Sequence, residues 1–273
     1  MITLRPRGPF TVPLEAEVIS PDVMAGQSLS TIGRLPVVQG NAQGPLDEFF
    51  TVEGQPDDSI RLDGDFSGVK HIGKGMTGGR IEIHGDAGMH LGAEMRGGEI
   101  VVRGSVADWA GAEMRGGLLR VMGDAGHLLG AGYRGSEKGM RGGTILVTGN
   151  AGNETGCAMR RGVIAVGGKA GDFTGVMMIA GTIVVLGELG IRTAAAMKRG
   201  TIIAYGGNGR PPALLPTFRF DCTYRPAWVE IYLRRLARLG LAVPEALHGG
   251  VYRRYSGDLT EVGKGEILAW TSA

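Results

Sequence analysis

The chain has 273 residues, 50 of them glycine, with a formal net charge of +2 and a pI of about 8.6. This charge is too small to indicate nucleic-acid binding by itself. The glycine content excludes long helices over most of the chain, because glycine destabilises helix interiors.

Residues 1–45 carry no repeat and contain six prolines, from Pro6 to Pro45. Proline fixes φ and lacks an amide donor, so we predict extended segments and turns that cap the next domain. No basic region followed by an apolar run marks a signal peptide. The two cysteines, Cys157 and Cys222, show no CxxC spacing, so we expect free thiols in a cytoplasmic protein.

Residues 46–206 are predicted to form a repeat domain, whose first, degenerate turns are Phe50–Gly54 and Ile60–Asp65. Beyond them methionine recurs at steps of 19, 19, 26, 19, 19 and 19 residues, and each methionine opens nearly the same phrase: Met76, Met95, Met114, Met140, Met159, Met178 and Met197. A fixed period of this length is typical of a solenoid, in which each unit stacks on the next.

Alignment of the repeats on methionine gives columns with a strand pattern. The sixth and eighth columns are apolar, beginning with Ile81 and Ile83, and the fourth and tenth columns are always glycine. Apolar residues two apart indicate strands with one buried face, and glycine permits tight corners. We therefore predict an all-β fold, a right-handed parallel β-helix with about 19 residues per turn. Its handedness rests on analogy with known folds.

The 26-residue repeat has seven extra residues, Tyr133–Gly139, and the columns resume at Met140. This insertion is predicted to leave a corner as a loop, where function is often found. The seventh and ninth columns face outward and turn apolar in later repeats, at Leu146, Val184 and Ile203. We expect the C-terminal helix or another subunit to cover them, because a solvated face is polar.

Residues 207–273 are predicted to form a tail with one helix at 226–239. Trp228, Ile231, Tyr232, Leu236 and Leu239 are assigned to its apolar side, opposite Arg234, Arg235 and Arg238. The rest of the tail reads as irregular structure or short strands.

The second column is mostly basic, and stacking is expected to place its members in a row: Arg96, Arg115, Arg141, Arg160 and Lys198, beside Tyr133, Arg134 and Lys138 of the insertion. Glu94 and Glu113 can neutralise the early members, whereas Arg141, Arg160 and Arg161 are expected to lack acidic partners. One interpretation is a solvated edge; the other is an anion-binding stripe, because adjacent like charges repel without a counter-ion.

Catalytic and metal-binding patterns are missing from the sequence. The five histidines form no ligand motif, and no nucleophile elbow, phosphate loop or EF-hand loop is present. Asp86 and Asp124 share the eleventh column, but Ser105 and Lys169 interrupt it, which argues against a calcium roll. A polysaccharide-cleaving β-helix would need clustered carboxylates, and the outward columns have none. The residues alone therefore predict a binding or scaffold protein without catalytic or metal-ligating residues.

The glycine phrase G-x-x-G-x-x-x-G occurs at residues 85–92, 123–130, 149–156 and 168–175. It resembles the glycine-repeat β-helix at the C-terminus of the glutamate synthase large subunit. The sequence more closely resembles the C subunit of formylmethanofuran dehydrogenases and of the bacterial formyltransferase/hydrolase complex. Three further segments carry this resemblance: Gly73–Gly79, Asp108–Gly111 and Ala131–Gly143. The resemblance covers about residues 46–206.

This resemblance implies a scaffold subunit without a self-contained active site, in a complex that moves C1 units between tetrahydromethanopterin and methanofuran and releases or activates formate. Its expected partners are amidohydrolase-like and formyltransferase subunits, with no nucleic acid or membrane. No tightly bound cofactor is expected, but the basic row suits the polyglutamate tail of a methanofuran-type cofactor. The hydrolase complex is favoured; the alternatives are the C subunit of a dehydrogenase or a glutamate-synthase-like structural domain.

Overall fold

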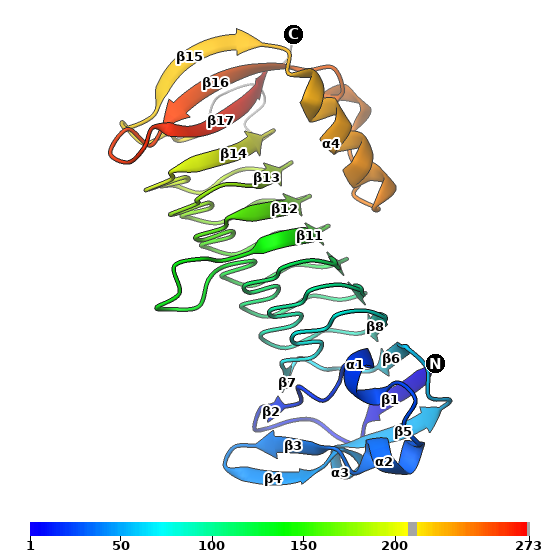
Figure 1. Ribbon diagram of the computed structural model, residues 1–273. Helices are drawn as coiled ribbons and strands as arrows, with labels where there is room; N and C mark the ends of the chain where they lie inside the picture. Colours follow the sequence, from blue (N-terminus) through cyan, green and yellow to red (C-terminus); the bar gives the residue numbers. More distant parts are fainter. Residues whose placement is uncertain (207–211, 272–273) are drawn as a thin grey trace.

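The computed structural model describes residues 1–206 and 212–271, and it is mostly β-structure. The repeats form a row of short strands along the molecule (Figure 1): β6 (Ser59–Asp63), β8 (Arg80–His84), β9 (Glu99–Val102), β10 (Leu118–Val121), β11 (Arg141–Val147), β12 (Arg161–Val166), β13 (Thr182–Val185) and β14 (Arg199–Ala204). A further two-residue strand, β7 (Val69–Lys70), precedes β8. None of the described helices is long and apolar enough to cross a membrane.

Neighbouring repeats pair in parallel through equivalent columns. Ile100 pairs with Ile81 on one side and with Leu119 on the other. Leu119 pairs in turn with Ile145, so the seven-residue insertion leaves the register unchanged. A second line of bridges connects Ala87, Val106 and Ala125 at another corner. The predicted stacking of like residues on like is confirmed for these positions.

The methionine column lies in the core, and all seven methionines have no exposed surface. It also explains the fourth column of glycines. Gly98 has φ +77°, and a Cβ there would lie 2.5 Å from Cε of Met76 in the preceding repeat. Only glycine relieves both the backbone strain and this clash.

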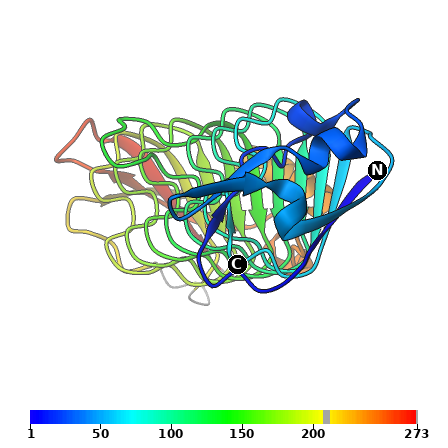
Figure 2. The ribbon, with the colours of Figure 1, turned by 90° about the horizontal axis from the view of Figure 1, so that it is seen from below.

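The N-terminal segment caps the first repeats with short elements, and Figure 2 shows them lying across this end of the stack. They are β1 (Ile2–Pro6), β2 (Leu14–Glu15), α1 (Pro21–Met24), α2 (Leu29–Gly33), β3 (Pro36–Gln39), β4 (Ala42–Pro45), α3 (Leu46–Phe49) and β5 (Phe50–Gly54). Residues 1–45 contain short strands and two single-turn helices, α1 and α2, and no long helix, whereas α3 and β5 lie within the range predicted for the repeat domain. β5 does not continue the row as a degenerate turn, since it pairs antiparallel with β1.

The C-terminal tail is more regular than predicted. It contains β15 (Arg219–Tyr224), α4 (Ala227–Arg238), a 3-10 turn (Glu245–Leu247), β16 (Val251–Gly257) and β17 (Lys264–Thr271). β17 pairs in parallel with β14, and Ile267 takes the core position beside Ile202. The large sheet therefore has 13 strands in the order β15-β16-β17-β14-β13-β12-β11-β10-β9-β8-β6-β1-β5, and a small sheet has the order β4-β3-β2-β7.

Helix α4 covers the outer faces of the later strands. Val229, Leu233 and Leu236 pack in one cluster with four strand residues: Leu146, Ala165, Val184 and Ile203. The prediction that these apolar outer faces are covered is confirmed. The predicted apolar side of the helix was wrong at Ile231, whose side chain is 69% exposed. The helix is instead buried along the line of residues 229, 233 and 236.

Candidate functional site

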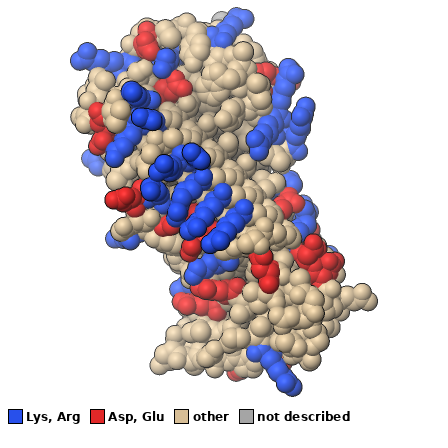
Figure 3. Space-filling view, in the orientation of Figure 1, with Lys and Arg blue, Asp and Glu red and all other residues tan. Residues whose placement is uncertain are grey.

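The basic residues of the second column lie in a row along one edge of the repeats. Each backbone amide donates a hydrogen bond to the carbonyl of a methionine one repeat earlier: Arg96 to Met76, Arg115 to Met95, Arg141 to Met114, Arg160 to Met140 and Lys198 to Met178, at 2.7–2.8 Å. The backbone thus fixes the spacing of these cations. Basic side chains gather in a band across the middle of the face in Figure 3.

Two members of the row are paired with acidic residues. Arg115 lies 3.8 Å from Glu94, and Arg141 lies 2.8 Å from Glu113. The expectation that Arg141 lacks an acidic partner is wrong, because each glutamate contacts the arginine of the following repeat. Glu94 and Glu113 each directly precede a repeat methionine. The residues in the equivalent position are Gly139 for Arg160 and Met177 for Lys198, and neither can form an ion pair. Among the described residues, Arg96, Arg160 and Lys198 form no ion pair.

A hollow of about 620 Å³ opens at the later end of the row. Two basic pairs line it, Arg160 with Arg161 and Lys198 with Arg199. The repeat between them contributes Ile179, Ala180, Gly181 and Thr182. Ala180 carries only a methyl group and Gly181 has no side chain, so the space between the pairs stays open. None of the residues that line this basic hollow is acidic.

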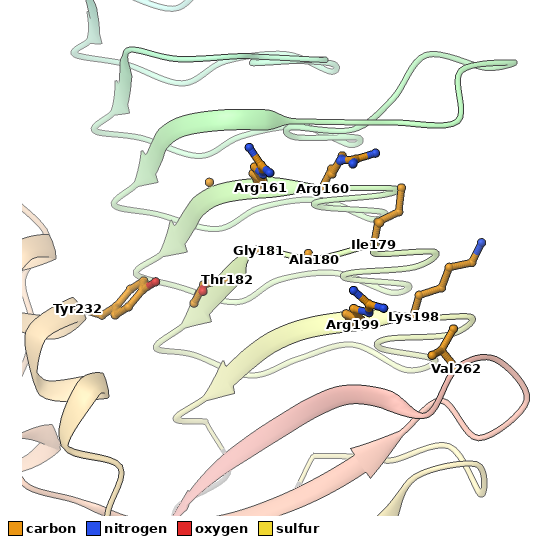
Figure 4. Close-up of a pocket in the computed structure, with 11 residues that line it drawn as sticks. Arg160, Arg161, Ile179, Ala180, Gly181, Thr182, Lys198, Arg199, Tyr232 and Val262 are labelled. Carbon is orange, nitrogen blue, oxygen red and sulfur yellow. The ribbon is translucent and has the colours of Figure 1, made fainter.

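Three parts of the chain contribute to the basic hollow (Figure 4). Arg161 opens β12 and Arg199 opens β14, two strands apart, which is about 10 Å at ordinary strand spacing. Tyr232 approaches from α4, and Val262 lies on the turn between β16 and β17. All four cations are exposed, and none forms an ion pair within the described part of the chain.

The insertion is held against the stack by its first residue. The Tyr133 ring lies 5.0 Å from the Trp109 ring, and its hydroxyl lies 3.1 Å from Nδ1 of His90. Burial, with help from nearby glutamates, raises the pKa of Tyr133 to about 12. Burial and the adjacent His71 lower the pKa of His90 to about 4. Both groups are therefore neutral near pH 7, and Tyr133 anchors the base of the insertion against Trp109 and His90.

The other two predicted residues of the insertion lie nearer the solvent. Arg134 is exposed. Lys138 and Lys198 line a second hollow beside the basic one. The eight predicted residues are therefore distributed over the basic row, the anchored base of the insertion and its exposed part.

The sequence prediction omitted Arg199 and Tyr232 and treated Arg161 only as an unpaired neighbour. The missed signal is the third column, which is glycine in four repeats and then becomes Arg161, Ala180 and Arg199. At Gly97 and Gly116 a Cβ would lie within 2.2 Å of a carbonyl oxygen one repeat earlier. Arginine in this column therefore marks repeats with a different local backbone.

The charge and shape of the basic hollow suit a ligand with several negative charges. Four exposed cations close together repel one another unless an anion neutralises them. Guanidinium groups bind carboxylates through paired, charge-assisted hydrogen bonds. Each exposed contact is weak and is screened by salt, so strong binding requires several anionic groups on one ligand. Three or more His, Cys, Asp or Glu side chains do not gather as a metal site anywhere in residues 1–206 and 212–271.

Part of the chain is similar to curated archaeal proteins. The C subunit of molybdenum-containing formylmethanofuran dehydrogenase 1 from Methanothermobacter thermautotrophicus is 48% identical over 88 residues, which are 32% of this chain and 22% of that protein. The corresponding protein from Methanosarcina barkeri is 45% identical over 93 residues, 32% of this chain and 31% of that protein. The chain thus spans about a fifth to a third of the length of these curated relatives.

A solved structure is similar over almost the whole chain. It is the X-ray crystal structure of the formyltransferase/hydrolase complex (FhcABCD) from Methylorubrum extorquens in complex with methylofuran. The TM-score is 0.89 and the sequence identity is 35%, with 98% of each chain covered. No family model matches the chain.

Proposed function

Because the chain belongs to the family that contains the C subunits of formylmethanofuran dehydrogenases, we propose that it is a non-catalytic scaffold subunit of a formyltransferase/hydrolase complex. The observation that carries this proposal is the 35% identity to a chain of such a complex over 98% of both chains. A second candidate is the C subunit of a formylmethanofuran dehydrogenase, which the 48% identity over 88 residues favours. The larger coverage favours the hydrolase complex.

The proposed complex moves a formyl group from tetrahydromethanopterin to a methanofuran-type carrier and releases it as formate. The chemistry belongs to amidohydrolase-like and formyltransferase subunits, which this chain holds together. We place the complex in the cytoplasm, which the two unpaired cysteines favour, since disulfides form mainly in oxidising compartments.

The basic hollow is the proposed contact for the polyglutamate tail of the carrier. Two cation pairs about 10 Å apart, with no acidic residue in the lining, suit a chain that carries a carboxylate on each unit. Arg96, Arg115 and Arg141 extend the same row, although Glu94 and Glu113 partly neutralise the last two. A tethered tail keeps the reactive end at a high local concentration, so the carrier can serve more than one active site.

We also propose the fold in its finer form: a right-handed parallel β-helix of about 19 residues per turn over residues 46–206. Residues 1–45 form its cap, and residues 207–273 form its tail. The pairing of columns 19 residues apart and the second line of bridges support one turn per repeat. A rigid stack of this kind presents partner sites at fixed distances, as a scaffold requires.

Co-expression with the predicted companion chains tests the scaffold function. The chain is expected to purify in a defined complex that hydrolyses formyl groups, whereas the purified single chain shows no formyl transfer and no hydrolysis. Turnover by the single chain, or an active companion complex that forms without it, would contradict the proposal.

A further inference from the structure

A second hollow of about 430 Å³ adjoins the basic one and shares Ile179 and Lys198 with it. Its floor consists of Ala158, Met177 and Ala196 together with the shared Ile179. One wall is the insertion at Ser136–Lys138, and the other is Glu261 on the turn between β16 and β17. We call it the insertion hollow.

The floor of the insertion hollow departs from the repeat pattern. Met177 occupies the column that holds Glu94 and Glu113 in earlier repeats, and all three have the same left-handed backbone, with φ between +52° and +57°. In those repeats the glutamate contacts the arginine one repeat later. Met177 is 50% exposed, so the core does not require an apolar side chain here. The column is uncharged at Ala158, Met177 and Ala196, so the floor of the insertion hollow is apolar, and the exposed part of Met177 is free to contact a molecule outside the chain.

Apolar exposure continues beyond the hollow along the turn between β16 and β17. Leu259 and Val262 on this turn are each 49% exposed, and Val262 also lines the basic hollow. A small molecule that fills 430 Å³ would leave Leu259 uncovered, whereas a polypeptide spans both the hollow and the turn. The extent of the apolar surface therefore favours a protein partner.

We infer that the insertion hollow is a docking site for a companion subunit, which inserts an apolar side chain against Met177 and Ile179. The inference rests on the proposed scaffold function and names where one partner binds. The rim has both signs, with Lys138 and Lys198 against Glu137 and Glu261. None of these four forms an ion pair in the described residues, so the matching segment carries an acidic and a basic residue beside its apolar anchor.

The position of this docking site has a consequence for the basic hollow. Because the two hollows share Ile179 and Lys198, a subunit seated in the insertion hollow forms one side of the basic hollow. A ligand held by Arg161 and Arg199 would then lie directly beside that subunit.

Met177→Glu tests the docking site, because the repeat itself shows that the backbone accepts glutamate at this position. The new carboxylate lies opposite Lys198, as Glu113 lies opposite Arg141. Ile191→Asp is the matched control. Ile191 is 55% exposed, and its column holds Asp108 and Asp172 in other repeats, but it does not line the hollow. Both variants replace an exposed apolar side chain with the acid of its own column.

The measurement is the affinity of each purified variant for the companion subunits, after thermal unfolding has shown both variants to be folded. Met177→Glu is expected to weaken binding about tenfold or more, and Ile191→Asp to leave it unchanged. A photo-crosslinking residue at 177 in the assembled complex is expected to attach to an apolar segment of a companion chain.

Three outcomes would overturn the inference: equal affinity for both variants, a crosslink from 177 to a second copy of this chain, or no polypeptide crosslink in a complex that assembles. Failure of the wild-type chain to assemble would instead contradict the scaffold function itself.

Discussion

Polar side chains at the corners of the repeats act mainly on the backbone of the next repeat. Asp86 accepts a hydrogen bond from the amide of Ser105 at 2.7 Å, and Asp124 accepts one from the amide of Asn150 at 2.6 Å. The interrupted aspartate column of the sequence thus has a structural role, because any short acceptor, including Ser105, satisfies the next amide. These side chains thus provide hydrogen-bond acceptors for backbone amides at the corners, where the strand ladder provides none.

Asp258 performs a similar task at the junction of the tail with the last repeat. Its carboxylate is buried and accepts hydrogen bonds from the amide of Ala196 at 3.0 Å and from the amide and hydroxyl of Thr260 at 2.9 and 2.7 Å. Burial alone would raise the pKa of Asp258, but these hydrogen bonds outweigh burial and lower it below the ordinary value.

The lowered pKa of Asp258 predicts an acid-sensitive contribution to stability. The carboxylate stabilises the fold above about pH 4, and this contribution is lost as the pH falls through its folded-state pKa. Asp258→Asn is expected to unfold at a lower temperature near pH 7, and the difference from the wild type should shrink on acidification to about pH 3. Thermal unfolding over this pH range measures the effect; a constant difference would show that the ionised carboxylate is unimportant.

At the scale of elements, α4 illustrates what a sequence pattern can and cannot define. The pattern located this helix to within one residue at each end, since Pro226 precedes it and its apolar residues recur at helical spacing. The pattern misplaced the buried side of the helix. From the sequence, Ile231 and Val229 are equally plausible as buried residues until the position of the helix on the strands is known. That position depends on contacts with residues such as Leu146 and Val184, far away in sequence.

The buried side of α4 leads to a paired stability prediction. Leu233→Ala removes a side chain that is 1% exposed, and it is expected to cost about 2–5 kcal/mol of unfolding free energy. Ile231→Ala removes a side chain that is 69% exposed, and it should change the unfolding free energy by less than about 0.5 kcal/mol. Urea unfolding of both variants measures the two losses of unfolding free energy. A larger loss for Ile231→Ala than for Leu233→Ala would mean that the helix packs through its other side.

At the scale of the whole molecule, the periodic part was predictable and the closing parts were not. The 19-residue period fixes which residues stack, so the glycine, methionine and arginine columns could be placed from the sequence. The ends of the stack break the period: β17 extends the parallel sheet without a methionine phrase, and β1 lies between β6 and β5. These pairings join distant segments, and no local pattern specifies them.

The basic hollow depends both on the repeat columns and on contacts between segments that are distant in the sequence. Arg160 and Lys198 belong to the predicted second column, whereas Arg161 and Arg199 belong to the third column, which the prediction did not use. The shape of the hollow depends on the small residues of the intervening repeat and on Tyr232 from α4. Arg161 and Arg199, more than the glutamate-paired Arg115 and Arg141, are therefore the principal contacts that we expect for an acidic chain.

The most direct test of the basic hollow as a polyglutamate site is calorimetric titration of the purified chain with polyglutamate of defined length at low and high salt. The double variant Arg161→Gln/Arg199→Gln is expected to bind about tenfold more weakly at low ionic strength, with a smaller difference at high salt because the contacts are exposed. Arg235→Gln/Arg238→Gln on α4 removes the same charge outside the hollow and should bind like the wild type. Equal weakening of both double variants would show that polyglutamate responds only to net charge, and the basic hollow would then not be its binding site.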